Sequence, residues 1–290
     1  MRTEQEMFDL ILSTAYKDER IRAVYMNGSR TNKNAVKDIF QDYDIMYVVE
    51  ETTSFREDKS WIDQFGERLF MQYPEDNSFY QKDVENCYGW LIQFTDGNRL
   101  DLHVCTLRHA LNNISEDRLC TILLDKDKCL PNIPEATDED YWIKKPTEKQ
   151  FLDTCNEFWW CLNNIAKGLW REEIPYVMDM LNCIVRPQLI RLLEWKIGFQ
   201  TNFSVSTGKS CKYMYKWLEA KTWNKFLKTY PCGVIKDIWE AVFIMCDLFN
   251  DAVREVSCMM KVKYNEIEAN NSYKYLKDVH VLPKDAKEIY

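Results

Sequence analysis

Three aspartates in the first half of the chain have the type and spacing of a divalent-cation site. Asp42 and Asp44 begin a run rich in aromatic and β-branched residues, which predicts a strand over residues 42–49. Because alternate residues of a strand face the same side, both carboxylates project away from the core. Asp101 lies between two leucines in a later strand-like run, so it also faces away from the core. If these strands are neighbours, three carboxylates meet on one face, and Mg²⁺ prefers such oxygen ligands.

The third carboxylate has more than one chemical role open to it. Asp101 can bind a second metal ion, accept a proton as a general base, or do both, and we expect both. His103 follows two residues later on the same face and is a rival base, because an imidazole titrates near neutrality. We expect His103 to be an ordinary hydrogen-bonded histidine. Asp42, Asp44 and Asp101 are therefore the expected catalytic and metal-binding residues.

A Gly-Ser turn upstream of the aspartates is suited to an anion. Gly28 and Ser29 follow an apolar run over residues 21–26 that predicts a strand. Gly28 lets backbone N–H groups approach an anion closely, and Ser29 adds a hydroxyl donor. We expect this turn to hold the phosphates of a nucleotide.

A cationic segment in the second half is a further candidate for phosphate binding. Lys209 follows a glycine at the start of a predicted helix over residues 210–220, which also carries Lys212 and Tyr213. The N–H groups of a helix N-terminus together with a lysine suit phosphate oxygens. The segment lacks the first glycine of a P-loop and is not one. Lys144 and Lys145 are alternative phosphate ligands, with a solvated pair an equally good interpretation.

The elements that position these residues divide the chain into two parts. In the first part we expect a helix with a capping box at Thr3, strands over 21–26 and 42–49, a short helix over 61–70 and a hairpin over 90–104. From Thr147 onward apolar residues recur at helical spacing, with helices expected over 174–185, 187–199, 210–220, 223–229 and 234–260. The segment 130–134 contains two prolines and is the best linker. This indicates an α+β chain with a strand-rich domain over 1–136 and a helical domain over 137–290.

Composition limits the classes of partner. The 290-residue chain has a net charge of −8, which disfavours extended electrostatic binding to the phosphates of nucleic acid and favours a cationic partner. Its 11 cysteines form no C-x-x-C pair and do not combine with the three histidines at zinc spacing, so we expect reduced thiols in the cytoplasm and no zinc. We find no secretory segment and no apolar run long enough to cross a membrane.

The order of the three motifs resembles a known signature. A Gly-Ser turn after a strand, then D-x-D, then an aspartate between apolar residues is the pattern of nucleotidyltransferases of the DNA polymerase β superfamily. The stretches MNGSRTNKN, FQDYDIMYVV, DGNRLDLHV, LLDKDK, DEDYWIKKPT, CNEFWWCLNN, VMDMLNCIVRPQL and TGKSCKYMYKWL are similar, in order, to bacterial aminoglycoside 6-adenylyltransferases, also called streptomycin adenylyltransferases. This resemblance extends from Met1 to about Phe249.

The resemblance implies a fold and an activity. A mixed-sheet nucleotidyltransferase domain would precede a helical bundle that binds substrate. The enzyme would use ATP and Mg²⁺, with two ions expected, to transfer AMP to a hydroxyl of streptomycin, releasing pyrophosphate and conferring antibiotic resistance. Gly28, Ser29 and Arg30 fall on the family's phosphate turn. Asp101 falls on its third carboxylate, where some related enzymes have a glutamate base.

The drug would need carboxylates, because its guanidinium groups are permanently cationic. Glu157, on the first helix of the second domain, is our candidate, with Asp179 behind it. Neither half offers both a nucleotide turn and a cationic-drug pocket, so we expect both domains to contribute. The chain would act as a monomer or small homo-oligomer.

Two other functions remain open. One is a catalytically silent nucleotide- or drug-binding module, or an antitoxin-like interaction protein, on the same fold. The other is a polymerase-like transferase acting on RNA ends, which the negative charge disfavours. Retention of all three carboxylates counts against a silent copy, because clustered negative charge is costly without cations.

Overall fold

The computed structural model describes residues 1–80 and 82–290, which form two compact units, Met1–Asp140 and Tyr141–Tyr290. The division falls after Asp140 rather than after residue 136. Residues 137–140 belong with the first unit because Thr137 N–H donates to the Arg118 carbonyl and the Arg118 side chain pairs with Glu139 and Asp140. Each unit is described by itself.

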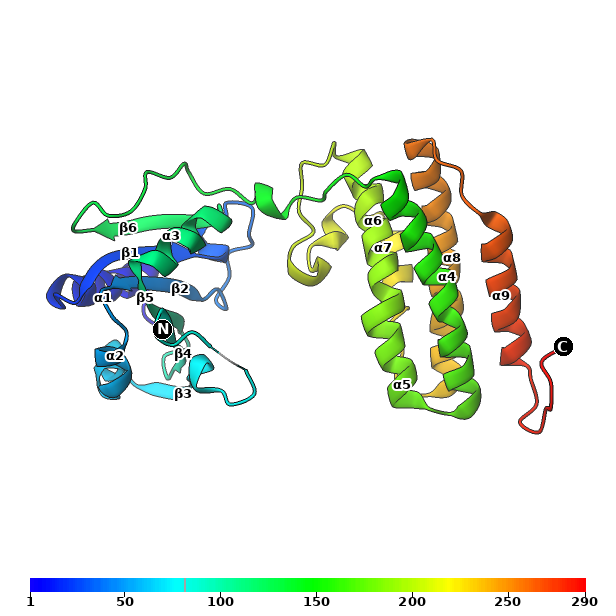
Figure 1. The fold of residues 1–290 in the computed structure, drawn as a ribbon, viewed down its shortest axis with the longest axis horizontal. Helices are drawn as coiled ribbons and strands as arrows, with labels where there is room; N and C mark the ends of the chain where they lie inside the picture. Colours follow the sequence, from blue (N-terminus) through cyan, green and yellow to red (C-terminus); the bar gives the residue numbers. More distant parts are fainter. Residues whose placement is uncertain (81) are drawn as a thin grey trace. The chain divides into compact units, whose positions relative to one another are not determined.

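The first unit contains a six-stranded sheet in the order β3-β4-β5-β2-β1-β6 (Figure 1). Its strands are β1 (Ile21–Asn27), β2 (Tyr43–Val49), β3 (Arg68–Gln72), β4 (Cys87–Phe94), β5 (Arg99–Thr106) and β6 (Cys120–Asp125). The β2–β5 pair is parallel, whereas the other neighbours are antiparallel. The sheet is therefore mixed, as expected.

Apolar residues cover both faces of this sheet. Alternation along β2 sends Ile45 and Tyr47 into a core shared with α1 (Glu4–Lys17) and α2 (Thr53–Glu57). Met46 faces the other side, in a smaller cluster with α3 (Leu107–Glu116). The N-terminus of α1 has the expected capping box between Thr3 and Glu6. Strands β2 and β5, which lie next to each other, are thus the two central strands of a sheet packed on both faces.

The helix expected over residues 61–70 is wrong. Residues Trp61–Phe65 form a single 3₁₀ turn, and the chain continues as edge strand β3. Gly66, with a φ of 121°, ends the turn in a conformation that excludes helix continuation. Trp61 and Phe65 of this turn pack in the sheet core.

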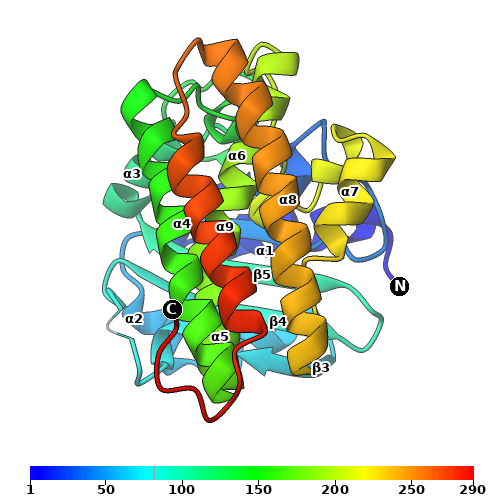
Figure 2. The same cartoon turned by 90° about the vertical axis from the view of Figure 1, so that its right-hand side faces the viewer.

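The second unit is a helical bundle, as expected. It contains α4 (Glu148–Arg171), α5 (Ile174–Asp179), α6 (Arg186–Gln200), α7 (Ala220–Leu227), α8 (Ile235–Met260) and α9 (Glu266–His280), with a π-helical turn over Met180–Val185. Figure 2 shows α4, α8 and α9 running lengthwise beside one another. Phe158 of α4 stacks on Phe249 of α8 with ring centroids 3.7 Å apart, and both rings lie in the core of the bundle.

The helix expected over residues 210–220 is also wrong. Two short 3₁₀ turns, Lys209–Cys211 and Met214–Lys216, occupy this segment. Ser210 and Cys211 both have positive φ, which breaks the right-handed path at the point where a helix would begin. Sequence analysis also missed β3, β6, α2, α3 and α9.

The structure gives one observation on the cysteines and one on helices that could span a membrane. All 11 cysteines are free thiols. Among the described residues, no helix combines the length and apolar character needed to cross a bilayer.

Candidate active site

The three aspartates meet at the centre of the sheet. The parallel register of β2 and β5 places Asp44 directly beside Asp101, and Asp42 immediately precedes β2. One carboxylate oxygen from each residue lies within 4.8 Å of the other two, and all three side chains are partly buried. Three converging carboxylate oxygens are a donor set for a hard divalent cation. Asp42, Asp44 and Asp101 therefore fit a divalent cation both in their geometry and in the chemistry of their ligand atoms.

Electrostatic strain at the cluster also fits a cation. Burial, together with the charges of Asp42 and Asp101, raises the pKa of Asp44 to about 7, against the opposing charges of Arg99 and Arg30. An Mg²⁺ ion at these oxygens would offset that repulsion and favour the ionised carboxylate.

Arg99 is a member of the cluster that sequence analysis missed. Its Nε and Nη2 donate to the two oxygens of Asp101 at 2.8 and 2.7 Å, and its Nε lies 3.7 Å from a carboxylate oxygen of Asp42. Arg99 is two residues before Asp101 on β5 and therefore shares its face. That spacing was the available signal.

Gly28 brings the Gly-Ser turn against these carboxylates. Asn27, the last residue of β1, pairs with Asp44, and Gly28 follows with a φ of 76° before the 3₁₀ turn Ser29–Thr31. A Cβ on Gly28 would lie 2.0 Å from an Asp44 carboxylate oxygen. Glycine is thus required twice, for its backbone conformation and for this close approach.

Arg30 holds the segment before β2 in place. Its Nε donates to the Asp42 carbonyl and its Nη2 to the Gln41 carbonyl, both at 2.8 Å. Its guanidinium lies 3.6 Å from the ring centroid of Tyr43, and its Nη1 pairs with Glu4 at 3.2 Å. The side chain is 11% exposed, so Arg30 is fixed by the protein and positions Asp42.

His103 lies beside the cluster in a partly buried position. A Cβ on Gly89 of the neighbouring strand would lie 2.2 Å from its ring, and its Nε2 is 4.0 Å from Glu75. Burial lowers the pKa of His103, although the charges of Glu75 and Asp101 oppose this. Glu75 also accepts the Gly89 N–H at 2.9 Å. The ring is therefore a packed neighbour of Asp101, and Glu75 is a further acidic residue that sequence analysis missed.

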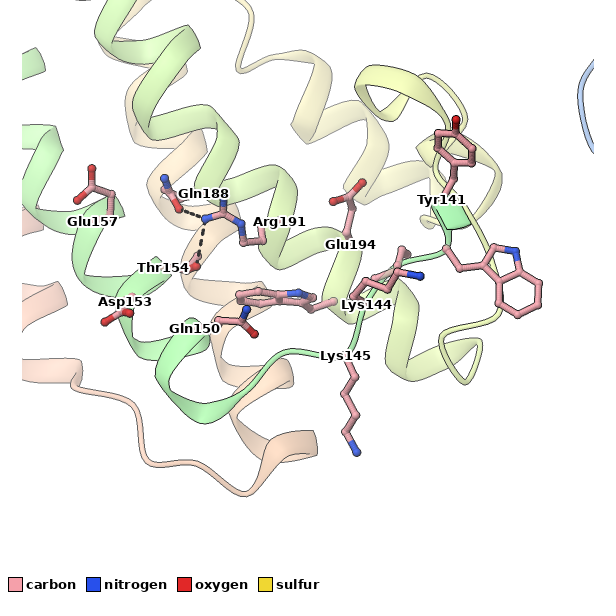
Figure 3. A pocket seen from close by; sticks show the side chains of 13 residues that line it. Tyr141, Lys144, Lys145, Gln150, Asp153, Thr154, Glu157, Gln188, Arg191 and Glu194 are labelled. Carbon is pink, nitrogen blue, oxygen red and sulfur yellow. Dashed lines mark hydrogen bonds between the residues drawn. The ribbon is translucent and has the colours of Figure 1, made fainter. Parts of the chain in front are cut away.

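The second unit contains a polar cavity of about 770 Å³, a volume suited to a drug-sized molecule (Figure 3). Glu157 of α4 lines it, together with Glu194 of α6. Arg191 is turned toward Gln188 and Thr154, to which it donates hydrogen bonds. The lining residues are Tyr141, Trp142, Ile143, Lys144, Lys145, Gln150, Asp153, Thr154, Glu157, Gln188, Arg191, Glu194 and Trp195.

Glu194 is the more buried of the two glutamates. It accepts a hydrogen bond from the Thr207 hydroxyl, and burial raises its pKa while that bond and the charge of Arg191 oppose the shift. Glu157 is exposed and accepts a weak hydrogen bond from Cys161 at 3.4 Å. Asp179 is outside the set of described lining residues: it is exposed at the end of α5 and accepts from Cys183. Asp179 therefore does not line the cavity that Glu157 lines.

The phosphate candidates of the second unit lie in irregular chain. A three-residue 3₁₀ turn, and not an α-helix, begins at Lys209, so the expected α-helix N-terminus does not exist there. Lys212 Nζ lies 5.1 Å from the ring centroid of Tyr213, whose N–H donates to the Thr207 carbonyl at 2.7 Å. Thr207 links this segment to Glu194 and so to the cavity.

Comparison with known proteins gives consistent matches along the chain. The family model described as streptomycin adenylyltransferase matches residues 1–279. An aminoglycoside 6-adenylyltransferase of Bacillus subtilis (strain 168) is 41% identical over 269 residues, covering 92% of this chain and 95% of that protein. One of Staphylococcus aureus is 37% identical over 271 residues, covering 93% and 96%. The crystal structure of an aminoglycoside 6-adenyltransferase from Bacillus subtilis aligns with 97% of this chain and 100% of that chain, at 36% identity and a TM-score of 0.48.

Proposed function

The chain belongs to the streptomycin adenylyltransferase family, and we propose that it transfers AMP from ATP to a hydroxyl group of streptomycin, releasing pyrophosphate and conferring resistance. The observation that carries the proposal is the convergence of Asp42, Asp44 and Asp101 beside the glycine turn at Gly28. A phosphate-accepting turn next to a divalent-cation site is what transfer of a nucleotidyl group requires.

The reaction needs few chemical groups from the protein. The drug hydroxyl oxygen attacks the α-phosphorus of ATP, the bond to the bridging oxygen breaks, and pyrophosphate leaves. Magnesium ions, when bound, would neutralise the phosphate oxygens and the leaving group. Asp42, Asp44 and Asp101 would hold them, and two ions are expected.

The chain's own groups would orient the ATP phosphates and remove the proton from the attacking hydroxyl. Gly28 and Ser29 would bind phosphate oxygens through backbone N–H groups and a hydroxyl. Arg30 donates a hydrogen bond to the backbone carbonyl of Asp42 and so keeps the Asp42 carboxylate in position. The Asp101 carboxylate would accept the proton of the attacking hydroxyl.

The drug is assigned to the cavity of the helical unit. Glu157 and Glu194 offer carboxylates, and Gln150, Thr154 and Gln188 offer the neutral donors and acceptors that a polyhydroxylated cation needs. The net charge of −8 favours a cationic substrate as well. Lys209, Lys212 and Tyr213 are retained as candidate phosphate contacts, with Lys144 and Lys145 as alternatives.

One assay tests the proposal. Purified protein is incubated with ATP and Mg²⁺ across a panel of aminoglycosides, pyrophosphate is measured, and the drug is examined by mass spectrometry for added AMP. We expect both signals with streptomycin. ATP binding without pyrophosphate release with any drug would instead indicate a silent binding module.

A further inference from the structure

Two arginines approach the aspartate cluster, and they are held in opposite ways. Arg30 binds backbone carbonyls, stacks on Tyr43 and is 11% exposed. The Arg99 side chain is 47% exposed, and among the described residues its side-chain hydrogen bonds all go to the carboxylate of Asp101. The protein therefore fixes Arg30 in place, whereas the hydrogen bonds and ion pairs that the structure describes for the Arg99 guanidinium go only to the carboxylates of Asp42 and Asp101.

The position of Arg99 conflicts with that of a metal ion. Its fork occupies both carboxylate oxygens of Asp101 and lies 3.7 Å from Asp42. A cation bound by Asp101 must share an oxygen with this guanidinium, and the two positive charges would repel each other at short range. Forked arginine–carboxylate pairs are among the stronger hydrogen-bonded contacts in proteins.

We propose that Arg99 is a releasable counter-ion: it neutralises the aspartates in the metal-free enzyme, leaves Asp101 when a divalent cation binds, and then pairs with a phosphate oxygen of the nucleotide. The last step rests on the proposed function, because it takes a nucleoside triphosphate as the anion. Each ligand then removes an obstacle to the other, so metal and nucleotide bind cooperatively. Arg99 thereby prevents tight metal binding in the absence of substrate.

The first test measures metal affinity without nucleotide. Mn²⁺ is titrated into the full-length protein and free Mn²⁺ is followed by electron paramagnetic resonance, for the parent and for Arg99→Gln. We expect Arg99→Gln to bind Mn²⁺ about tenfold more tightly, the factor corresponding to one charge-assisted hydrogen bond. Unchanged or weaker binding would mean that Arg99 only orders Asp101, and would overturn the proposal.

Two further variants distinguish the effect of the forked Arg99–Asp101 hydrogen bonds from the effect of net charge alone. Arg99→Lys keeps the positive charge but cannot bind both oxygens of Asp101, so its Mn²⁺ affinity should also rise, though less. Arg22→Gln removes one charge from the same unit by breaking a pair with Asp127, and should leave Mn²⁺ affinity unchanged. An equal rise in Arg22→Gln would reduce the effect to net charge and refute the counter-ion role.

A second titration tests the coupling. In the presence of a non-hydrolysable ATP analogue, the Mn²⁺ affinity of the parent should rise by a larger factor than that of Arg99→Gln. An equal factor in both proteins would refute the release onto phosphate. The nucleotide-free titration needs neither ATP turnover nor drug, so failure of the proposed adenylyl transfer is recognised separately, by absent pyrophosphate release from the parent.

Discussion

Gly28 and Asp44 are in such close contact that no side chain fits between them: a Cβ on Gly28 would lie 2.0 Å from the Asp44 carboxylate oxygen. The turn that would bind phosphate and the carboxylate that would bind metal are thus fixed relative to each other by the smallest residue. Displacing either one displaces the other.

Gly28→Ala is therefore expected to lower activity by about 100-fold, the scale of loss when a reacting group is misplaced by about 1 Å. Gly97→Ala is the matched control, because Gly97 has a φ of 89° and no described atom lies within 4 Å of its added Cβ. Both variants carry the backbone penalty of roughly 1–2 kcal/mol, measured by thermal unfolding. Equal activities for the two variants would contradict the contact argument.

Asp44 gives the folded protein a distinctive pH dependence. Its pKa is raised from 3.8 to about 7, so between those values the folded protein retains a proton that the unfolded chain has lost. The free energy of unfolding should fall as the pH rises through this range. Asp44→Asn removes the effect and should be more stable than the parent by roughly 2 kcal/mol at pH 8 in EDTA, a difference that shrinks toward pH 5.

Urea unfolding at the two pH values measures this difference. Magnesium should restore the stability of the parent at pH 8 but have little effect on Asp44→Asn, which should also lack activity. If the difference in unfolding free energy between the parent and Asp44→Asn in EDTA is the same at pH 8 as at pH 5, the electrostatic strain inferred at the cluster is refuted.

Asp101 and His103 are separated by a pair of substitutions. Asp101→Asn should lose about 10²–10⁴-fold in kcat, because Asn neither accepts the proton nor carries charge for a metal. His103→Asn should retain most of its activity, since the partly buried imidazole packs against Gly89. Single-turnover kinetics with streptomycin measure both, and the reverse ranking would assign the base to His103.

The cavity residues are tested by drug binding. Glu157→Gln and Glu194→Gln should each weaken streptomycin binding by about tenfold in calorimetric titrations, because a carboxylate facing a guanidinium loses its charge. Gln can still accept the hydrogen bond from Thr207, so Glu194→Gln preserves the local contact. Asp179→Asn, outside the cavity lining, should have no effect. Equal losses in all three variants would instead indicate a long-range charge effect.

Lys209 is tested against ATP. Lys209→Ala should raise the KM for ATP by about tenfold while leaving streptomycin affinity unchanged, because an ammonium group attracts phosphate and repels guanidinium. Lys228→Ala, an exposed lysine after α7, is the control. If both variants behave like the parent, Lys144 and Lys145 become the next candidates.

Local patterns predicted much of the sheet and of the site. Alternation within strands identified the faces of Asp44 and Asp101, since a strand has a fixed period of two. Their adjacency depends on the parallel register of β2 and β5, which a single sequence does not specify. Arg99 was missed although its spacing from Asp101 places it on the same face, because the pairing of its guanidinium with the Asp101 carboxylate depends on side-chain conformation.

The errors arose where backbone conformation overrode side-chain spacing. Residues 61–70 and 210–220 both carry apolar residues at helical intervals, yet Gly66 and Ser210 adopt positive φ and end or prevent the helix. Strand β6 and helix α9 were missed because their burial comes from tertiary contacts rather than from a strong local pattern.

The parallel pairing of β2 with β5 has a consequence for the order of events during folding. A parallel pair cannot close through a tight turn, so the chain must first traverse β3 and the β4–β5 hairpin. In a nascent chain, Asp42 and Asp44 are therefore synthesised well before Asp101. The slow, non-local pairing of β2 with β5 then brings the three residues together. Cation affinity should consequently emerge late in refolding, after the hairpin has formed, so a metal-sensitive signal would report the final closure of the sheet.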